Sequence, residues 1–423
     1  MATAALGIPM MDDRNEDPHR KELLNNKLTA ADWINSSECE LERNPLQAQT
    51  LISSGLQLEP GMGAGYFNLG LALHQQARPT AAIRAYRLAL RYANGDDLVR
   101  ESAKRNLAQD LLLTGNFNEG WNCYEERLKQ SNYGCLNEKY GEPWQGINDP
   151  RSLRRLVLVA EQGLGDTLMF SRLGLDLQEK LKCPVTLQCQ KPLVKLLQRY
   201  SALDEVIEDI KEIKANSTGQ LWCPLMSLPQ KIELVPTQLK HRSAYISLDS
   251  QAVKEWEVKL GRRNGHKLIG LHWQGNPKHE GSLYSRGRSI KFNELSGLKK
   301  IQGVEYVSVQ KGAGSEQLEH RAGLNFVRGQ NEVSASMDFI DTACVLANCD
   351  LLITADSGVA HLAGALGIRT WLLLCFVPEW RWGMRNTTTP WYPSMKIFRQ
   401  TKYGEWATVI NSMVKEWNMG KES

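Results

Sequence analysis

Residues 351–374 hold side chains that are well placed to bind an anion. An apolar run at 351–354 is followed by the polar turn Asp356-Ser357-Gly358, then by apolar residues at helical spacing and by a second apolar run. Continuous apolar strands on either side of a helix are typical of a parallel βαβ unit. The helix would direct its unpaired N–H groups and the positive end of its dipole at the sheet edge, where a phosphate or diphosphate is favoured.

Each side chain in this turn has a functional and a structural interpretation. Gly358 would let a ligand approach the backbone closely, and Ser357 can donate to a ligand oxygen or cap the helix. His361, four residues after Ser357, lies on the same helical face. Alternatively, Asp356 and Ser357 only cap the helix, and His361 is a packed side chain bonded to a carbonyl. The stretch by itself leaves both interpretations open.

A second candidate turn follows the apolar run 153–160 and contains Gly163, Gly165 and Asp166. The two glycines predict a tight turn that exposes the Asp166 carboxylate beyond the end of a strand, where α/β folds bind their ligands. This carboxylate could act as the general base that activates an acceptor hydroxyl. Alternatively, it is the N-cap of the following helix. Leu168 stands where a dinucleotide fingerprint has its third glycine, which disfavours a nicotinamide enzyme.

The composition argues against several classes of protein. The chain of 423 residues has a formal net charge of +4 and no dense basic run, so we expect no nucleic-acid binding. Its nine cysteines contain no Cys-x-x-Cys pair, which favours buried thiols over a disulfide or metal framework. The N-terminus does not resemble a signal peptide, and the apolar runs are too short to cross a bilayer. We therefore expect a cytoplasmic protein with no bound metal and no transmembrane segment.

The order of the patterns predicts five segments with a hinge near 236–263. They are a disordered lead (1–20), helical repeats (21–131), a linker (132–152), a first Rossmann-like domain (153–250) and a second Rossmann-like domain (251–423). Two doubly wound sheets that face each other form a cleft, and ligands bind there above the carboxyl ends of the strands.

The helical region repeats itself at a fixed offset. Leu69, Gly70, Leu73, Ala82 and Tyr86 have similar residues 38 positions later. Small residues at such offsets permit close helix crossing, and the spacing resembles the tetratricopeptide repeat. Repeats of this kind stack into a solenoid whose concave face contacts a peptide or protein partner. Alternatively, the hairpins only brace the domain that follows.

Several motifs in this order resemble glycosyltransferase family nine, the ADP-heptose:lipopolysaccharide heptosyltransferases. The turn from Gly163 to Asp166 and the segment from Asp356 to Gly367 carry this resemblance. From about residue 40 onward, the chain is similar to bacterial proteins in which tetratricopeptide repeats precede such a domain. Further motifs that carry it are Gly120-Trp121-x-x-Tyr124-Glu125-x-Arg127, Trp273-Gln274-Gly275-Asn276-Pro277 and Trp391-Tyr392-Pro393-Ser394-Met395.

The resemblance implies an α/β, GT-B-like fold in which two doubly wound Rossmann-type domains face a cleft after an all-α solenoid. The first domain would bind the acceptor and the second the nucleotide-sugar donor. Asp166 corresponds to the family's proposed base, and Asp356, Ser357, Gly358 and His361 correspond to its segment for the donor's diphosphate. Such enzymes need no metal, because a helix dipole and basic side chains take the charge of the leaving group.

Three basic residues are candidates for that cationic role. Lys311 follows the strand predicted at 304–310, while Arg286 and Arg288 lie in the loop after the motif at 273–277. A guanidinium can hold a phosphate at two points. Alternatively, each of the three is a solvated surface charge.

We therefore expect an inverting, metal-independent glycosyltransferase, in the cytoplasm or peripheral to the inner membrane. It would move a sugar from a nucleotide-diphosphate donor, with no other cofactor, to a glycan, a lipopolysaccharide-type acceptor or a protein hydroxyl. Two alternatives stay open. One is a repeat-based adaptor that binds a nucleotide or glycan without turnover, and the other is a protein O-glycosyltransferase whose repeats hold a peptide.

Overall fold

The computed structural model describes residues 28–130, 134–213, 218–239 and 243–419. The chain divides between residues 103 and 104 into two compact units, and each unit is considered by itself. The lead predicted to be disordered, residues 1–20, lies outside the described residues.

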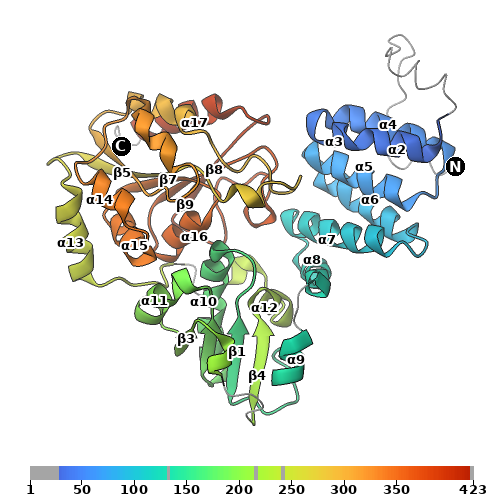
Figure 1. The fold of residues 1–423 in the computed structure, drawn as a ribbon, viewed down its shortest axis with the longest axis horizontal. Coiled ribbons are helices and arrows are strands. Elements are labelled where there is room, and N and C mark those ends of the chain that lie inside the picture. The colour runs from blue at the N-terminus through green and yellow to red at the C-terminus, as the bar shows by residue number, and fades with distance from the viewer. Residues whose placement is uncertain (1–27, 131–133, 214–217, 240–242, 420–423) are drawn as a thin grey trace. The chain divides into compact units, whose positions relative to one another are not determined.

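The first unit is built from helices, in agreement with the predicted helical region (Figure 1). They are α2 (Ala30–Glu38), α3 (Glu40–Arg43), α4 (Pro45–Leu58), α5 (Gly63–Gln75), α6 (Pro79–Arg91) and the first part of α7 (Asp97–Leu113). Consecutive helices α4 and α5, and α5 and α6, pack against each other. A tetratricopeptide solenoid stays a prediction.

Local sequence explains where these helices begin and how closely they cross. The side chain of Thr29 accepts from the backbone of Asp32, forming a capping box at the start of α2. A Cβ atom on Gly70 of α5 would lie 2.3 Å from the ring of Tyr86 in α6. Glycine is therefore required at this crossing, as the offsets of small residues predicted.

In the second unit, helices precede the first sheet. They are the rest of α7, then α8 (Phe117–Tyr124) and the 3₁₀ helix η2 (Glu125–Gln130) from the predicted repeat region, and α9 (Gly134–Tyr140) from the predicted linker. In the described residues the sheet is parallel, with the order β3-β2-β1-β4. Its elements are β1 (Arg155–Val159), α10 (Leu164–Leu181), β2 (Val185–Gln188), α11 (Lys191–Tyr200), β3 (Glu205–Ile207), η3 (Ile210–Glu212), β4 (Gln220–Pro224), η4 (Leu225–Ser227), α12 (Leu228–Lys231) and η5 (Pro236–Gln238).

The second sheet is also parallel, with the order β6-β5-β7-β8-β9. Every residue of β7 and β8 is buried, as expected for strands covered on both faces. The prediction of two parallel sheets with helices between their strands is thus confirmed, while their division into two domains stays a prediction. The elements are α13 (Ser250–Leu260), β5 (Lys267–His272), η6 (Pro277–His279), η7 (Phe292–Lys300), β6 (Val304–Ser308), η8 (Ser315–Gly323), α14 (Gln330–Ala335), α15 (Phe339–Ala347), β7 (Leu351–Ala355), α16 (Gly358–Ala365), β8 (Thr370–Leu374), η9 (Trp380–Trp382), β9 (Met395–Arg399) and α17 (Trp406–Met419).

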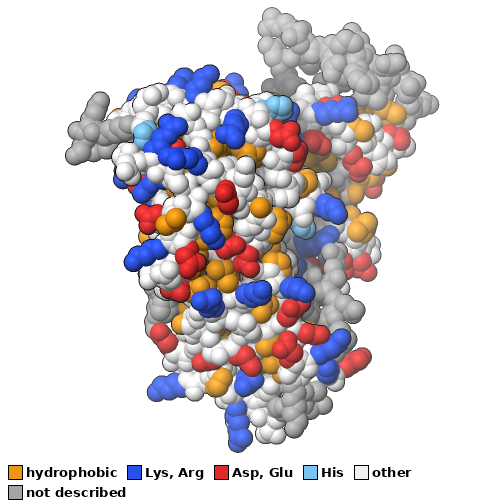
Figure 2. Space-filling model, turned by 60° about the vertical axis from the view of Figure 1, so that its left-hand side comes forward, with side chains coloured by type: hydrophobic (Ala, Val, Ile, Leu, Met, Phe, Trp, Pro, Cys, Tyr) orange, Lys and Arg blue, Asp and Glu red, His pale blue; other side chains and the backbone are white. Residues whose placement is uncertain are grey.

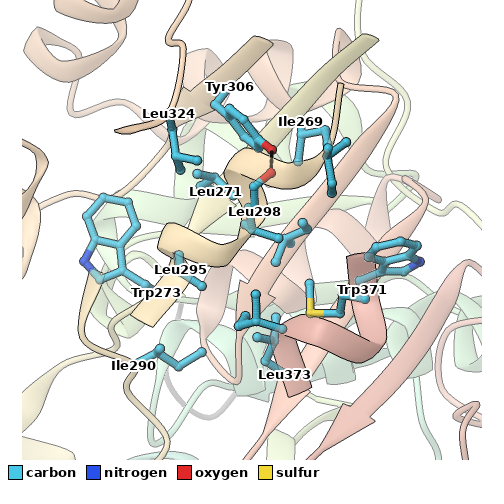
Figure 3. Packing of buried hydrophobic residues seen from close by; sticks show 14 of the residues in the cluster. Ile269, Leu271, Trp273, Ile290, Leu295, Leu298, Tyr306, Leu324, Trp371 and Leu373 are labelled. Atoms are coloured by element: carbon cyan, nitrogen blue, oxygen red, sulfur yellow. Dashed lines mark hydrogen bonds between the residues drawn. The ribbon is translucent and has the colours of Figure 1, made fainter. Parts of the chain in front are cut away.

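A large cluster of buried apolar side chains packs on one face of the second sheet (Figure 3). Trp273 and Trp371 are almost fully buried in it. The hydroxyl of Tyr306 donates to the carbonyl of Leu298 at 2.8 Å, which satisfies the one polar atom of that ring. This packed core gives the strand ends, and hence the turns beyond them, a fixed position.

Two segments expected to be connectors contain helices. The predicted linker 132–152 includes α9, where the Tyr140 hydroxyl donates to the carbonyl of Ile210 at 3.0 Å. The predicted hinge includes α13, where the Trp256 indole donates to Asp341 at 2.9 Å. The sequence did not indicate either helix, because the linker is rich in Gly, Pro and Asn and the hinge is charged and weakly periodic, and each helix depends on one aromatic anchor.

Among the described helices, none is both long and apolar enough to cross a membrane. On the face seen in Figure 2, basic and acidic side chains are intermingled, in keeping with the near balance of 51 Lys and Arg against 47 Asp and Glu.

We expect Gly70→Ala to destabilise the first unit by about 1–3 kcal/mol, because the added methyl overpacks the crossing with Tyr86. This loss should appear even though alanine has the higher helix propensity. Urea unfolding followed by circular dichroism measures it. Gly61→Ala is the matched control, since a Cβ there meets nothing within 4 Å. Equal stability of the two variants would contradict the crossing geometry.

Candidate active site

The N-terminus of α10 lies directly after β1 and positions Asp166. The backbone N–H of Gly163 donates to Oδ2 of Asp166 at 2.8 Å. Asp166 therefore stands in the first turn of the helix, and the predicted N-cap position is wrong. The predicted glycine turn is also wrong in detail. Gln162 has the left-handed backbone, with φ of 61°, whereas Gly163 has φ of −87° and Gly165 already belongs to the helix.

Gly165 serves close approach between α10 and α16. A Cβ atom on Gly165 would lie 2.7 Å from Cδ2 of His361 and 3.3 Å from Cα of Gly358. The N-terminus of α10, which follows a strand of the first sheet, therefore touches the N-terminus of α16, which follows a strand of the second sheet. Because both ends carry partial positive charge, anionic groups between them are favoured.

Ser357 stands at the N-cap of α16, but its side chain does not cap the helix. Its hydroxyl instead lies 3.1 Å from Nδ1 of His272, the last residue of β5. Burial lowers the pKa of His272 to about 4, so the imidazole is neutral at pH 7. The first N–H groups of α16 thus point beyond the sheet without a serine cap.

His361 is a buried, neutral side chain. Its Nδ1 lies 2.9 Å from the hydroxyl of Tyr392, and its ring stacks on Trp382 with centroids 5.4 Å apart. Burial, and after it the nearby arginines, lower the pKa of His361 well below its usual value. His361 is therefore packed, as the structural interpretation expected, although its partner is a hydroxyl and not a carbonyl; a role in donor binding stays a prediction.

Arg381, which no sequence motif indicated, connects segments that follow the first and the second sheet. Its guanidinium forms ion pairs with Asp166 and with Glu379, and it lies over the ring of Trp380 at 4.2 Å. Burial lowers the pKa of Arg381, but the charges of Glu379 and Asp166 outweigh it, so the pKa is raised. An arginine between two tryptophans just after a buried strand was the signal that could have revealed it.

Arg288 is brought to the predicted donor segment. Its Nε lies 3.6 Å from Oδ2 of Asp356, and its Nη2 donates to the Asp356 carbonyl at 3.3 Å. The charge of Asp356 is the main cause that raises the pKa of Arg288. Of the three predicted cations, Arg288 thus has its contacts at the start of α16.

The contacts of the other two predicted cations lie elsewhere. Arg286 lies over the ring of Tyr403 at 4.5 Å. Lys311 donates to the carbonyl of Val333 in α14, and burial lowers its pKa to about 8. The sequence placed Lys311 at a strand end correctly, but the direction of its side chain depends on a helix that follows later in the chain.

Buried donors without an acceptor among the described residues gather at the same edge of the second sheet. They lie at the last residue of β9 and in the segments that follow β8 and β9, whose carboxyl ends meet there because the sheet is parallel. Buried polar groups are normally paired, so these donors are available to a ligand or to water. The atoms are Trp380 Nε1, Arg381 Nε, Trp382 Nε1, Arg399 Nε and Nη1, and Gln400 Nε2.

Metal-ligating side chains do not gather in the part of the chain that the structure describes. No group of three or more His, Cys, Asp or Glu is arranged there to hold a metal ion. The cluster around Asp166 and Asp356 is instead a set of alternating carboxylates and guanidinium groups.

Comparison with known families matches residues 290–413 to Glycosyltransferase family 9 (heptosyltransferase). The matched range includes Asp356, His361 and Arg381, and it leaves out Asp166 and the whole first sheet. Residues 290–413 of the chain are thus similar to this family.

Protein FlbA of Caulobacter vibrioides is 25% identical over 371 residues, which cover 83% of this chain and 60% of FlbA. The chain therefore spans about three fifths of that relative's length. Among solved structures, the ADP-heptose lps heptosyltransferase II of E. coli is 12% identical, with a TM-score of 0.43 over 64% of this chain and 100% of that chain. A glycosyl transferase family 9 protein of Veillonella parvula is 13% identical, with a TM-score of 0.42 over 59% and 87%.

We expect His272→Gln to reduce the acid sensitivity of the fold. The folded pKa of about 4 lies below the ordinary 6.5, so the stabilisation is complete above pH 6.5 and is lost as pH falls from 6.5 to 4. This difference between the folded and the ordinary pKa corresponds to about 3 kcal/mol in the free energy of unfolding. Urea unfolding at several pH values measures it. His279→Gln, at an exposed site, is the control, and identical pH dependence in both variants would contradict the burial argument.

Proposed function

We propose that the protein is a glycosyltransferase that moves a sugar from a nucleotide-diphosphate donor to a hydroxyl of a glycan or protein. One observation carries the proposal. Arg288 contacts Asp356 just before the N-terminus of α16, and Arg381 pairs with Asp166 at the adjoining N-terminus of α10, while α16 itself lies within the range that matches glycosyltransferase family 9. A diphosphate would supply acceptors to these guanidinium groups, and a helix N-terminus favours its charge.

The donor's diphosphate would bind at the start of α16. The backbone of Ser357 and Gly358 would donate to its oxygens, and Arg288 would pair with its charge. Asp356 orients Arg288 through the contacts described above. Neutral His361 would fill the space under the turn without adding charge. Lys311 and Arg286 remain candidates for more distant parts of the donor.

The transfer step would use Asp166 as the base. Its carboxylate takes the proton of the acceptor hydroxyl while the hydroxyl oxygen attacks the anomeric carbon. The bond from that carbon to the diphosphate oxygen breaks, and the electron pair leaves with the diphosphate. Attack opposite to the leaving group inverts the configuration of the anomeric carbon. Arg288 and the helix dipole would stabilise the departing charge without a metal.

Before this step, Asp166 must part from Arg381. One carboxylate oxygen pairs with Arg381 and the other accepts the Gly163 N–H, so each oxygen of Asp166 already has a partner. A diphosphate competes for the same guanidinium, because phosphate and carboxylate present similar oxygen pairs. Donor binding would thus draw Arg381 away and release Asp166 for the acceptor. The proposal implies that the donor binds before proton transfer.

We expect one nucleoside diphosphate, among UDP, ADP, GDP and CDP, to raise the melting temperature of the parent protein, because a ligand of the folded state stabilises it. ADP belongs in the set because the motifs resemble those of the ADP-heptose:lipopolysaccharide heptosyltransferases. Arg288→Met should weaken that ligand's binding by about tenfold, which corresponds to about 1.4 kcal/mol. Arg328→Met, at an exposed site in the same domain, should leave it unchanged. Absence of a shift with every nucleotide would favour the adaptor alternative.

We expect Asp166→Asn to abolish turnover while nucleoside diphosphate binding becomes tighter, by up to about tenfold. The reason is that asparagine no longer competes for Arg381. Transfer from a labelled donor and isothermal titration with the nucleotide measure the two effects.

Asp97→Asn, at a highly exposed site, is the matched control. Weaker nucleotide binding in Asp166→Asn would contradict the competition for Arg381. Retained turnover would exclude Asp166 as the base. A parent protein that binds the nucleotide but never transfers a sugar would support the adaptor instead.

A further inference from the structure

The segment formed by α8 and η2 contacts the turn that precedes α10. Arg127 makes a two-point ion pair with Glu161, in which Nε donates to Oε2 at 3.1 Å and Nη2 to Oε1 at 2.8 Å. Both side chains are only 11% exposed. A two-point contact between a guanidinium and a carboxylate fixes orientation as well as distance, and burial protects it from screening.

Further hydrogen bonds hold the same pair in place. Nη2 of Arg127 also donates to the hydroxyl of Ser227 at 2.8 Å. Oε1 of Glu161 accepts the backbone N–H of Met226 at 3.0 Å. The pair thus ties three segments together, namely η2, the turn after β1 and the 3₁₀ helix after β4.

Tyr124 holds the next residue of the turn, Gln162. The Tyr124 hydroxyl lies 3.0 Å from Nε2 and 3.2 Å from Oε1 of Gln162. Gln162 has the left-handed backbone that side chains other than glycine rarely adopt, so surrounding contacts must maintain it. Burial raises the pKa of Tyr124 to about 12, so the hydroxyl keeps its proton.

The same helix also touches the neighbour of Arg381. Trp121 and Tyr124 lie edge-on to Trp380, with ring centroids 5.2 and 6.0 Å apart. The Trp380 ring in turn lies under the guanidinium of Arg381. Helix α8 therefore contacts Trp380, which adjoins Arg381, and Gln162, which lies four residues before Asp166.

We infer that Tyr124 and Arg127 are positioning residues, which hold the turn at 161–163 so that Asp166 faces the donor domain. The inference rests on the proposed function, because it assigns Asp166 as the base. A helix that only braced the domain would need apolar contacts alone, and it would not need a two-point buried ion pair beside a strained residue. The catalytic unit therefore begins before α8 and not after residue 131.

The test uses the full chain with the variants Tyr124→Phe, Arg127→Met and Arg127→Lys. Tyr124→Phe removes one hydroxyl, so we expect a melting temperature close to the parent's and about a tenfold loss of turnover number, since small misplacement of a catalytic group is costly. The dissociation constant of the nucleoside diphosphate should stay within about twofold, because the start of α16 is untouched. Arg127→Lys keeps the charge but loses the two-point contact. Its turnover number should therefore lie between those of Arg127→Met and the parent.

A second readout does not depend on turnover. Hydrogen exchange of the backbone at 161–166 should be faster in Tyr124→Phe and Arg127→Met than in the parent, while exchange at 356–361 stays the same. Arg84→Met, at an exposed site on α6, is the control for both measurements. Parent-like exchange at 161–166, or parent-like turnover, would overturn the inference. If the parent itself lacks turnover, the proposed function fails, while the exchange result still decides whether these residues hold the turn.

Discussion

The structure of the site depends on one contact, at which the N-termini of α10 and α16 meet. Without a side chain at Gly165 the two helices approach closely enough for His361 to reach the first turn of α10. Two like dipole ends in contact repel each other, so negative charge must lie nearby. Asp166 and Glu379 supply it, and Arg381 lies between the two carboxylates.

This charge arrangement suits exchange with an anionic ligand better than it suits stability. Buried ion pairs contribute little net stability, because removing both charges from water costs about as much as their attraction returns. Arg381 and Arg288 are each held by carboxylates, and Arg381 keeps a buried Nε without an acceptor among the described residues. Under the proposed function, an arriving diphosphate would therefore replace a carboxylate at little cost, and the released carboxylate would become available for chemistry.

The helices before the first sheet are part of the same arrangement. In the second unit, Tyr124 and Arg127 bond to the turn before α10, while Trp121 packs on Trp380 after β8. Three stretches far apart in the sequence thus meet at one place. Because the left-handed Gln162 lies among them, the turn that carries Asp166 is held by tertiary contacts rather than by its own glycines.

The sequence by itself determined the two parallel sheets, the helical N-terminal region and the two βα turns that carry Asp166 and Ser357. These follow from apolar periodicity and from Gly and polar residues at strand ends, which act within a few residues. Only the tertiary structure decided which side chains these residues contact. Asp166 and Arg381 are 215 residues apart, and Lys311 turns toward α14 although its strand end was predicted correctly. Such pairings depend on how packed elements bring distant side chains together, and no local pattern encodes that.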